Sequence, residues 1–323
     1  MVLAIAAIIA GFALLVWSAD RFVEGAASTA GHAGLPSILI GMVIVGFGTS
    51  APEMVVSAMA ASDGNPDLAL GNALGSNIVN ISLILGVTAI IAPITVQSKI
   101  VKNELPLLLA VVLFLGYLLY DGALSVIDAS LLLGGLVLFL VWSVYSGMKS
   151  PSDTLKTEFD TELKSHAMSL GKAIFWLIAG LTLLIISSRI LVWGAVEIAT
   201  ALGVSDLIIG LTIVALGTSL PELAASIIAA KKGEHDIAIG NVVGSNMFNI
   251  LAVIGIAGII EPIPHISTDV LYRDWSVMLV LSVILLVMAY GFGRQGRINR
   301  WEGGILLASY IAYNGYLVTS IIR

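Results

Sequence analysis

The sequence contains no cysteine among its 323 residues, and only 11% of its residues are charged. The lack of cysteine excludes disulfide bonds, thiolate metal sites and cysteine nucleophiles. Soluble domains carry about 25% charged residues. The scarcity of charge, together with 58% hydrophobic residues and a mean hydropathy of +1.03, therefore argues against a water-soluble enzyme. The net charge of −6 and the lack of a basic block exclude a nucleic-acid partner.

Long apolar runs dominate the sequence instead. A helix that crosses a bilayer needs about 20 mostly apolar residues, and the weak two-residue alternation of a membrane β-barrel is absent. We therefore expect an all-α membrane protein with ten transmembrane helices. The predicted spans are about 2–19, 37–61, 67–92, 104–120, 124–146, 169–191, 206–230, 236–260, 270–291 and 302–321.

The positions of lysine and arginine predict how these helices are oriented, because cytoplasmic connections are enriched in both residues. If the N-terminus lies outside, the inside connections hold Arg21, Lys99, Lys102, Lys149, Lys156, Lys164, Lys172, Lys231, Lys232, Arg294, Arg297 and Arg300. The outside then holds only Arg189, Arg273 and Arg323. We therefore expect both termini outside, and the longest connection, 149–168, to be a cytosolic linker.

An internal repeat divides the chain into two halves. Residues 46–86 and 215–255 are similar at a constant offset of 169, without a gap, and the similarity includes their polar residues. We expect two five-helix repeats, 1–148 and 169–323, joined by the linker 149–168. Because five is odd, the second half enters the membrane from the opposite side. Inverted repeats of this kind build many secondary transporters around a site near the membrane midplane.

The first repeated motif is Gly-Thr-Ser-Ala-Pro-Glu at 48–53 and Gly-Thr-Ser-Leu-Pro-Glu at 217–222. Proline has no N–H, so each helix should bend or break there and free a carbonyl. A charged residue in the middle of a span costs at least about 2.5 kcal/mol, so two glutamates at equivalent positions indicate a function. Packing of protonated glutamates is the alternative. The candidate oxygen donors are Thr49, Ser50, Glu53, Thr218, Ser219 and Glu222.

The second repeated motif has polar residues at every fourth position. Such residues line one face of a helix. They can bind an ion, or they can simply hold helices together, as small and amide side chains do in membranes. The glycines at 71, 75, 240 and 244 are expected to allow close helix packing. The ladders are Asn72, Ser76 and Asn80 in the first half, and Asn241, Ser245 and Asn249 in the second.

All the candidate ligands in the two motifs are oxygen atoms. Hard cations such as Ca²⁺, Na⁺ and Mg²⁺ prefer such ligands, and Ca²⁺ takes six to eight of them. Softer metals would need histidine or cysteine, which no predicted span contains. Two carboxylates would balance one divalent ion.

The paired motifs resemble the α-repeats of the cation/Ca²⁺ antiporter superfamily, and the chain is similar to its compact prokaryotic sodium/calcium exchangers. The resemblance covers nearly the whole chain and implies alternating access, in which the long first and sixth helices slide across the core. It departs at Asn249, where many sodium/calcium exchangers carry aspartate. The implied ligands are Thr49, Ser50, Glu53, Ser76, Asn80, Thr218, Ser219, Glu222, Ser245 and Asn249, with backbone carbonyls at Gly46 and Ala215.

The expected function is therefore secondary antiport of Ca²⁺ against Na⁺ in a prokaryotic cell membrane. An antiporter driven by H⁺ is the first alternative, because a buried glutamate can carry a proton. A cation channel is the second, although channels usually build their selectivity groups from several subunits. No enzyme motif such as HExxH occurs. We expect Ca²⁺, Na⁺ or H⁺ and membrane lipid as partners, with no cofactor and no obligatory protein partner.

Overall fold

The structure is a computed structural model that describes residues 1–33, 49–96, 103–149, 168–233, 235–291 and 296–322. The described residues form helices, which include four π-helical segments labelled η. The first half contains α1 (Val2–His32), α4 (Ala51–Ser62), α5 (Pro66–Val79), η2 (Asn80–Ile84), α6 (Leu85–Ile91), α7 (Leu105–Leu118) and α8 (Val126–Lys149). The second half contains α10 (Leu170–Leu202), α11 (Asp206–Ile209), η4 (Gly210–Val214), α12 (Ala215–Thr218), α13 (Leu220–Lys232), α14 (His235–Phe248), η5 (Asn249–Ile254), α15 (Gly255–Ile260), η6 (Val270–Trp275), α16 (Ser276–Tyr290) and α17 (Arg300–Ile322).

Six helical stretches in the described residues are long and apolar enough to cross a membrane, and a bent pair makes a possible seventh. The all-helical membrane class is confirmed. Ten spans remain a prediction: residues 37–48 of the second predicted span lie outside the described residues, α7 has only 14 residues, and α17 is not among the six stretches. The six are Val2–His32, Pro66–Ile91, Val126–Tyr145, Leu170–Leu202, Ile237–Ile260 and Val270–Tyr290, and the pair is Asp206–Thr218 with Leu220–Lys231.

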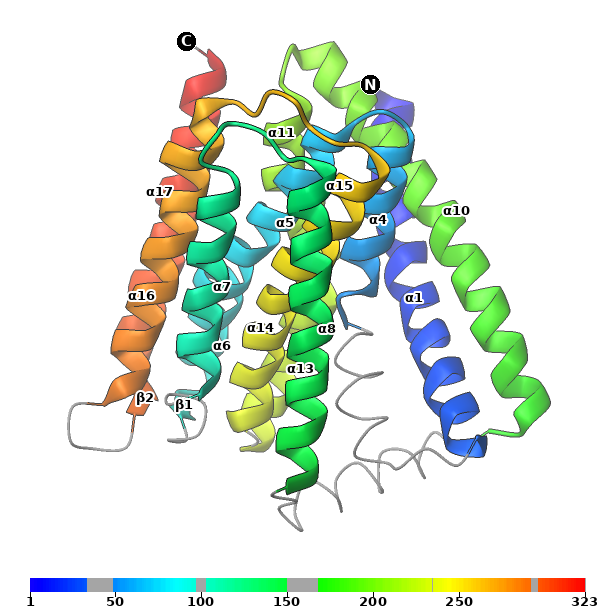
Figure 1. Cartoon of the computed structure of the whole chain (residues 1–323), viewed down its shortest axis with the longest axis vertical. Coiled ribbons are helices and arrows are strands. Elements are labelled where there is room, and N and C mark those ends of the chain that lie inside the picture. Colours follow the sequence, from blue (N-terminus) through cyan, green and yellow to red (C-terminus); the bar gives the residue numbers. More distant parts are fainter. Residues whose placement is uncertain (34–48, 97–102, 150–167, 234, 292–295, 323) are drawn as a thin grey trace.

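The repeat extends to the boundaries of the helices. Helices α5 and α14 begin and end at an offset of 169, and each continues into a π-helical segment. In Figure 1, α5 lies above α6, whereas α14 lies below α15. The equivalent segments of the two halves therefore run in opposite directions.

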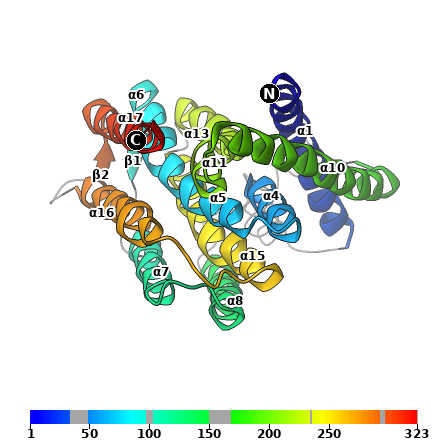
Figure 2. The same ribbon diagram turned by 90° about the horizontal axis from the view of Figure 1, so that it is seen from above.

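Helices α1 and α10 form an antiparallel pair on one side of the bundle (Figures 1 and 2). Glycines bring the two backbones together: a Cβ atom on Gly25 would lie 2.5 Å from the Leu177 nitrogen, and one on Gly180 would lie 2.6 Å from the Phe22 nitrogen. This pair packs against α4 and α12 rather than lying in the middle of the bundle.

Two predicted span ends are wrong. Helix α1 extends to His32 and α10 to Leu202, whereas we expected these spans to end near residues 19 and 191, with Arg21 in the connection after the first. Helix α1 continues past its predicted end because the charge of Arg21 is neutralised locally. The guanidinium lies 2.6 Å from Glu24 and 5.6 Å from the centre of the Trp176 ring of α10.

One small sheet was not expected. Strands β1 (Ile94–Val96) and β2 (Gly296–Ile298) pair antiparallel, with Thr95 opposite Arg297. The sheet lies at the end of the molecule opposite the two chain ends (Figure 1). Each strand has only three residues, too few for a periodicity that the sequence could reveal.

Candidate ion-binding site

The first repeated motif begins a new helix in each half. Helix α13 starts at Leu220 after a turn at Ser219, and the axis bends by 43° between the segments on either side. The predicted break at Pro221 is thus confirmed, because proline is tolerated only in the first turn of a helix. Helix α4 likewise starts at Ala51 after a turn at Ser50. Residues 34–48, which directly precede Thr49, lie outside the described residues.

Glu53 and Glu222 lie in the first turns of these helices, and both are fully buried. No lysine, arginine or histidine among the described residues pairs with either of them. In each carboxylate, Oε2 makes no hydrogen bond. The negative charge of the site is therefore not balanced by the described protein groups.

Hydroxyl groups from both halves surround the two carboxylates. Ser219 Oγ donates to Glu53 Oε1 of the other half at 3.4 Å, and Ser245 Oγ donates to Glu222 Oε1 at 3.2 Å. Thr49 Oγ1 lies 3.5 Å from Ser245 Oγ, again across the two halves. The structure thus brings the two copies of the first motif together in one place.

The second motif ends at the change from α-helix to π-helix. Asn80 is the first residue of η2 and Asn249 is the first residue of η5. Asn80 Nδ2 donates to Asn246 Oδ1 at 3.0 Å, which leaves Asn80 Oδ1 without a partner, and both amide atoms of Asn249 are unpartnered. π-Helical turns often mark functional sites, but the sequence offered no signal for these two.

Unpartnered buried oxygens concentrate on the predicted ligands. Leaving one such group unpaired costs about 1–3 kcal/mol, so a cluster of them needs a ligand to satisfy it. Their donor set suits a hard cation. The described residues contain no group of three or more histidine, cysteine or acidic side chains that could hold a metal ion. Among the described residues, the predicted ligands with an unpartnered oxygen are Ser50 Oγ, Glu53 Oε2, Ser76 Oγ, Asn80 Oδ1, Glu222 Oε2 and Asn249 Oδ1, and three further unpartnered oxygens lie on Asn77, Thr88 and Ser188.

The structure describes one of the two predicted backbone ligands and not the other. Gly46 lies outside the described residues. Ala215 is buried at the start of α12, and its carbonyl accepts a hydrogen bond from the Ser219 N–H at 3.1 Å and lies 3.3 Å from Thr218 Oγ1. One lone pair of this carbonyl is therefore used within the helix.

Sequence reasoning missed two serines beside the site. Ser57 and Ser226 are fully buried, and they accept hydrogen bonds from Asn72 and Asn241 at 3.0 and 3.3 Å. Each lies four residues after its glutamate and at the repeat offset of 169. That spacing was the signal that could have identified them.

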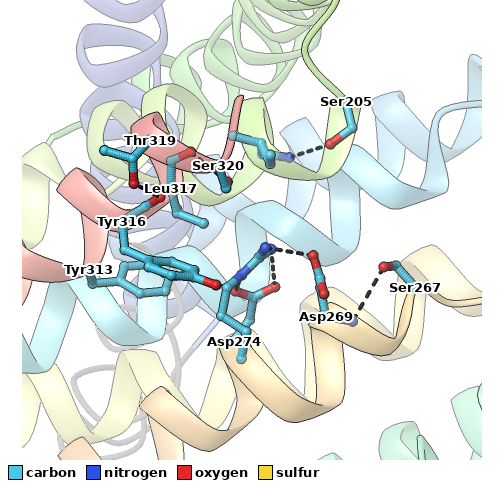
Figure 3. A network of polar contacts seen from close by, with 11 residues as sticks. Ser205, Ser267, Asp269, Asp274, Tyr313, Tyr316, Leu317, Thr319 and Ser320 are labelled. Atoms are coloured by element: carbon cyan, nitrogen blue, oxygen red, sulfur yellow. Dashed lines mark hydrogen bonds and ion pairs between the residues drawn. The ribbon is translucent and has the colours of Figure 1, made fainter. Parts of the chain in front are cut away.

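Asp274 is a buried carboxylate outside the candidate site, and its charge is paired within the protein. It is fully buried, like the two glutamates. Arg273 Nε lies 2.6 Å from one of its oxygens, and the Tyr313 hydroxyl donates to that oxygen at 2.8 Å (Figure 3). Arg273 also bonds Asp269. The protein thus supplies its own cation at Asp274 and supplies none of its described cations at Glu53 and Glu222.

Comparisons with known proteins agree with these observations. The family model described as sodium/calcium exchanger protein matches residues 3–145 and 172–319. CaxA of Alkalimonas amylolytica is 51% identical over 99% of this chain and 100% of its own length. Inner membrane protein YrbG of Escherichia coli is 41% identical over 97% of this chain and 96% of its own.

The fold is also similar to that of a solved transporter. The structure of the sodium-calcium exchanger NCX_Mj soaked with Na⁺ and Sr²⁺ aligns with a TM-score of 0.63 at 32% identity, and covers 97% of both chains. The chain is thus a multi-pass membrane protein, and its family consists of transporters, not enzymes. With both halves matched by the family model, this chain belongs to the sodium/calcium exchanger protein family.

Proposed function

We propose that this protein is a secondary antiporter that exchanges Ca²⁺ for Na⁺ at one site shared by its two halves. The carrying observation is the pair of buried carboxylates, Glu53 and Glu222, with no basic partner among the described residues. Two such charges balance one divalent ion. The proposed ligands are Thr49, Ser50, Glu53, Ser76, Asn80, Thr218, Ser219, Glu222, Ser245 and Asn249, while Gly46 and Ala215 remain predicted backbone ligands.

The proposed architecture is ten spans in two inverted five-helix repeats, 1–148 and 169–323, with 149–168 as a cytosolic linker and both termini outside. The opposite directions of α5–α6 and α14–α15 support the inversion (Figure 1). Both ends of the chain lie at the same end of the molecule, which an even number of spans requires (Figure 1).

Exchange would occur by alternating access. Helices α1 and α10 pack on each other through close glycine contacts and lie at the side of the bundle (Figure 2). In the proposed mechanism, this pair slides as one unit along α4 and α12. These two helices carry the proposed ligands Glu53 and Thr218. A site near the midplane of an inverted repeat is then reached from each side in turn. NCX_Mj, for which ion exchange and binding-site occlusion are described, supports this mechanism for a related fold.

H⁺ is the second candidate counter-ion. The observation that favours it is the same pair of glutamates, because a carboxylate buried without a basic partner is stabilised by taking up a proton. Na⁺ and H⁺ would act in the same pocket, so the two proposals differ in which of these ions replaces bound Ca²⁺.

The test is uptake of ⁴⁵Ca²⁺ into vesicles that contain the purified protein. We expect an outward Na⁺ gradient to drive uptake, and a pH gradient of equal size to drive much less. Uptake driven by the pH gradient alone would favour the H⁺ antiporter. Uptake that needs neither gradient would indicate a channel. Glu261→Gln, which alters an exposed glutamate at the end of α15, is the control and should transport like the parent.

A further inference from the structure

Asn72 on α5 connects the two halves of the molecule. Its Nδ2 donates to Ser57 Oγ at 3.0 Å and lies 3.5 Å from the backbone carbonyl of Glu53, both on α4. Its Oδ1 accepts from Thr218 Oγ1 of the other half at 3.2 Å. One buried amide therefore holds the helix that carries a proposed carboxylate ligand and, at the same time, a proposed hydroxyl ligand from the opposite repeat.

Asn241 on α14 makes the same three contacts in mirror image. Its Nδ2 lies 3.3 Å from Ser226 Oγ and 3.4 Å from the carbonyl of Glu222. Its Oδ1 accepts from Thr49 Oγ1 at 3.3 Å. Every residue of this second network lies 169 positions from its counterpart in the first. Helix packing alone would not require the repetition of all three contacts.

We propose that Asn72 and Asn241 are positioning residues that set the cation affinity of the site without contacting the ion. This inference rests on the proposed function. Each amide ties the carboxylate helix of its own half to a threonine of the other half, so the ligands of both repeats keep one relative geometry.

Asn72 and Asn241 differ from the proposed asparagine ligands in the hydrogen bonds that their amide oxygens accept. The carbonyl oxygens of Asn72 and Asn241 each accept a hydrogen bond from a threonine, whereas those of Asn80 and Asn249 have no partner among the residues that the structure describes. An amide oxygen that accepts the hydroxyl proton leaves the lone pairs of the threonine oxygen for a cation. The Thr218 hydroxyl also lies 3.1 and 3.3 Å from the carbonyls of Val214 and Ala215, so its single proton has an acceptor on the protein in each orientation.

A double-mutant cycle on the purified full-length protein tests the inference. Apparent affinities for Ca²⁺ and for Na⁺ are measured separately, from the rise of the thermal unfolding midpoint with CaCl₂ or NaCl. Asn72→Ala should weaken the affinity by about 3- to 10-fold, as expected for loss of a buried hydrogen-bond network. Combining it with Thr218→Val should cost clearly less than the product of the two single effects.

The repeat supplies the control for this cycle. Asn72→Ala combined with Thr49→Val should give the full product, because Thr49 bonds Asn241 instead. The mirror cycles with Asn241→Ala should couple to Thr49→Val and not to Thr218→Val. Ser62→Ala, at the end of α4, removes an exposed hydroxyl that donates to the carbonyl of Ala58 in the same helix, and it should leave both affinities within about twofold of the parent.

The milder variants Ser57→Ala and Ser226→Ala serve if the alanine variants of the asparagines do not fold. Each variant removes only the serine hydroxyl that accepts a hydrogen bond from the asparagine Nδ2. Ser57→Ala should still couple to Thr218→Val. Coupling that is equal for Thr49 and Thr218 would overturn the inference and leave the proposed function intact. A parent protein that neither Ca²⁺ nor Na⁺ stabilises would overturn the proposed function, and the inference with it.

Discussion

At the residue scale, three carboxylates are buried in the part of the chain that the structure describes, and their surroundings differ. Asp274 is paired with Arg273 and Tyr313, whereas the carboxylates of Glu53 and Glu222 accept hydrogen bonds from serine hydroxyl groups of the described residues. A buried charge without a protein partner needs an external cation or a proton. The difference indicates a structural role for Asp274 and supports the ion-binding role that we propose for the two glutamates.

Glu53→Gln and Glu222→Gln should each abolish Ca²⁺ transport while the protein still inserts and folds. Each change removes one of two charges, so a divalent ion would be half neutralised in a site of low dielectric constant. The measurement is ⁴⁵Ca²⁺ uptake under a Na⁺ gradient, normalised to the amount of folded protein in the vesicles. Parent-like uptake by either variant would contradict the assignment.

Asp274→Asn should act on stability rather than on ion binding. It leaves the partly buried Arg273 with only the exposed Asp269, and breaking a buried ion pair in this way costs about 3 kcal/mol. Tyr313→Phe removes one hydrogen bond to a charged group and should cost about 1.5–3 kcal/mol. The unfolding free energy of both variants should fall, while apparent Ca²⁺ affinity measured below their unfolding temperature stays unchanged. A shift in affinity would instead connect this cluster to the ion site.

At the element scale, the site lies where regular helices are interrupted. A turn precedes α4 and α13, and η2 and η5 widen the helices that carry the amide ligands. Close packing holds these elements in register. A Cβ atom on Gly71 would lie 2.3 Å from the carbonyl oxygen of Leu207, and one on Gly75 would lie 2.5 Å from that of Leu211. For these two glycines, the predicted close approach is confirmed, but it is wrong for Gly240 and Gly244, where no described atom lies within 4 Å of the Cβ position.

Gly75→Ala should therefore impair both folding and transport. The added methyl group would meet the backbone of η4, and backbone cannot move aside as a side chain can. Overpacking of this kind costs typically about 1–3 kcal/mol. Gly134→Ala on α8 is the matched control, because the position is exposed and has no described atom within 4 Å of its Cβ position. Its unfolding midpoint should stay level or rise, since alanine favours helices by about 1 kcal/mol over glycine. Equal midpoints for the two variants would contradict the packing argument.

At the scale of the whole molecule, two similar half-sequences adopt a site that is not symmetric. Asn80 bonds Asn246, but in the described residues the equivalent bond between Asn249 and Asn77 is absent. Ser219 bonds Glu53, whereas its counterpart Ser50 has no partner. This asymmetry is compatible with the proposed alternating access, in which one repeat moves against the other around a shared site.

If one pocket serves both ions, Na⁺ and Ca²⁺ must compete for it. Release of ⁴⁵Ca²⁺ from loaded vesicles should therefore require Na⁺ or unlabelled Ca²⁺ on the outside, and external Na⁺ should raise the Ca²⁺ concentration needed for half-maximal exchange. Both are measured on the same vesicle preparation at constant ionic strength. Steady release into a solution without either ion, above that of protein-free vesicles, would contradict a coupled exchanger.

The sequence by itself determined the membrane class, the repeat, the helix breaks and the concentration of oxygen donors. These are local properties, because apolar length, proline and the spacing of polar residues act within one helix. The constant offset of 169 also marks Glu53 and Glu222 as equivalent positions of the two halves.

Only the tertiary structure decided which of these polar groups bond one another and which do not. Asn72 and Asn80 occupy the same ladder in the sequence, yet one has its amide oxygen in a bond to Thr218 and the other has its oxygen free. Likewise, Arg273 is next to Asp274 in the chain, but Tyr313, which completes the cluster, is contributed by α17 (Figure 3). Such differences depend on contacts between helices distant in sequence. No periodicity within a single helix can encode them.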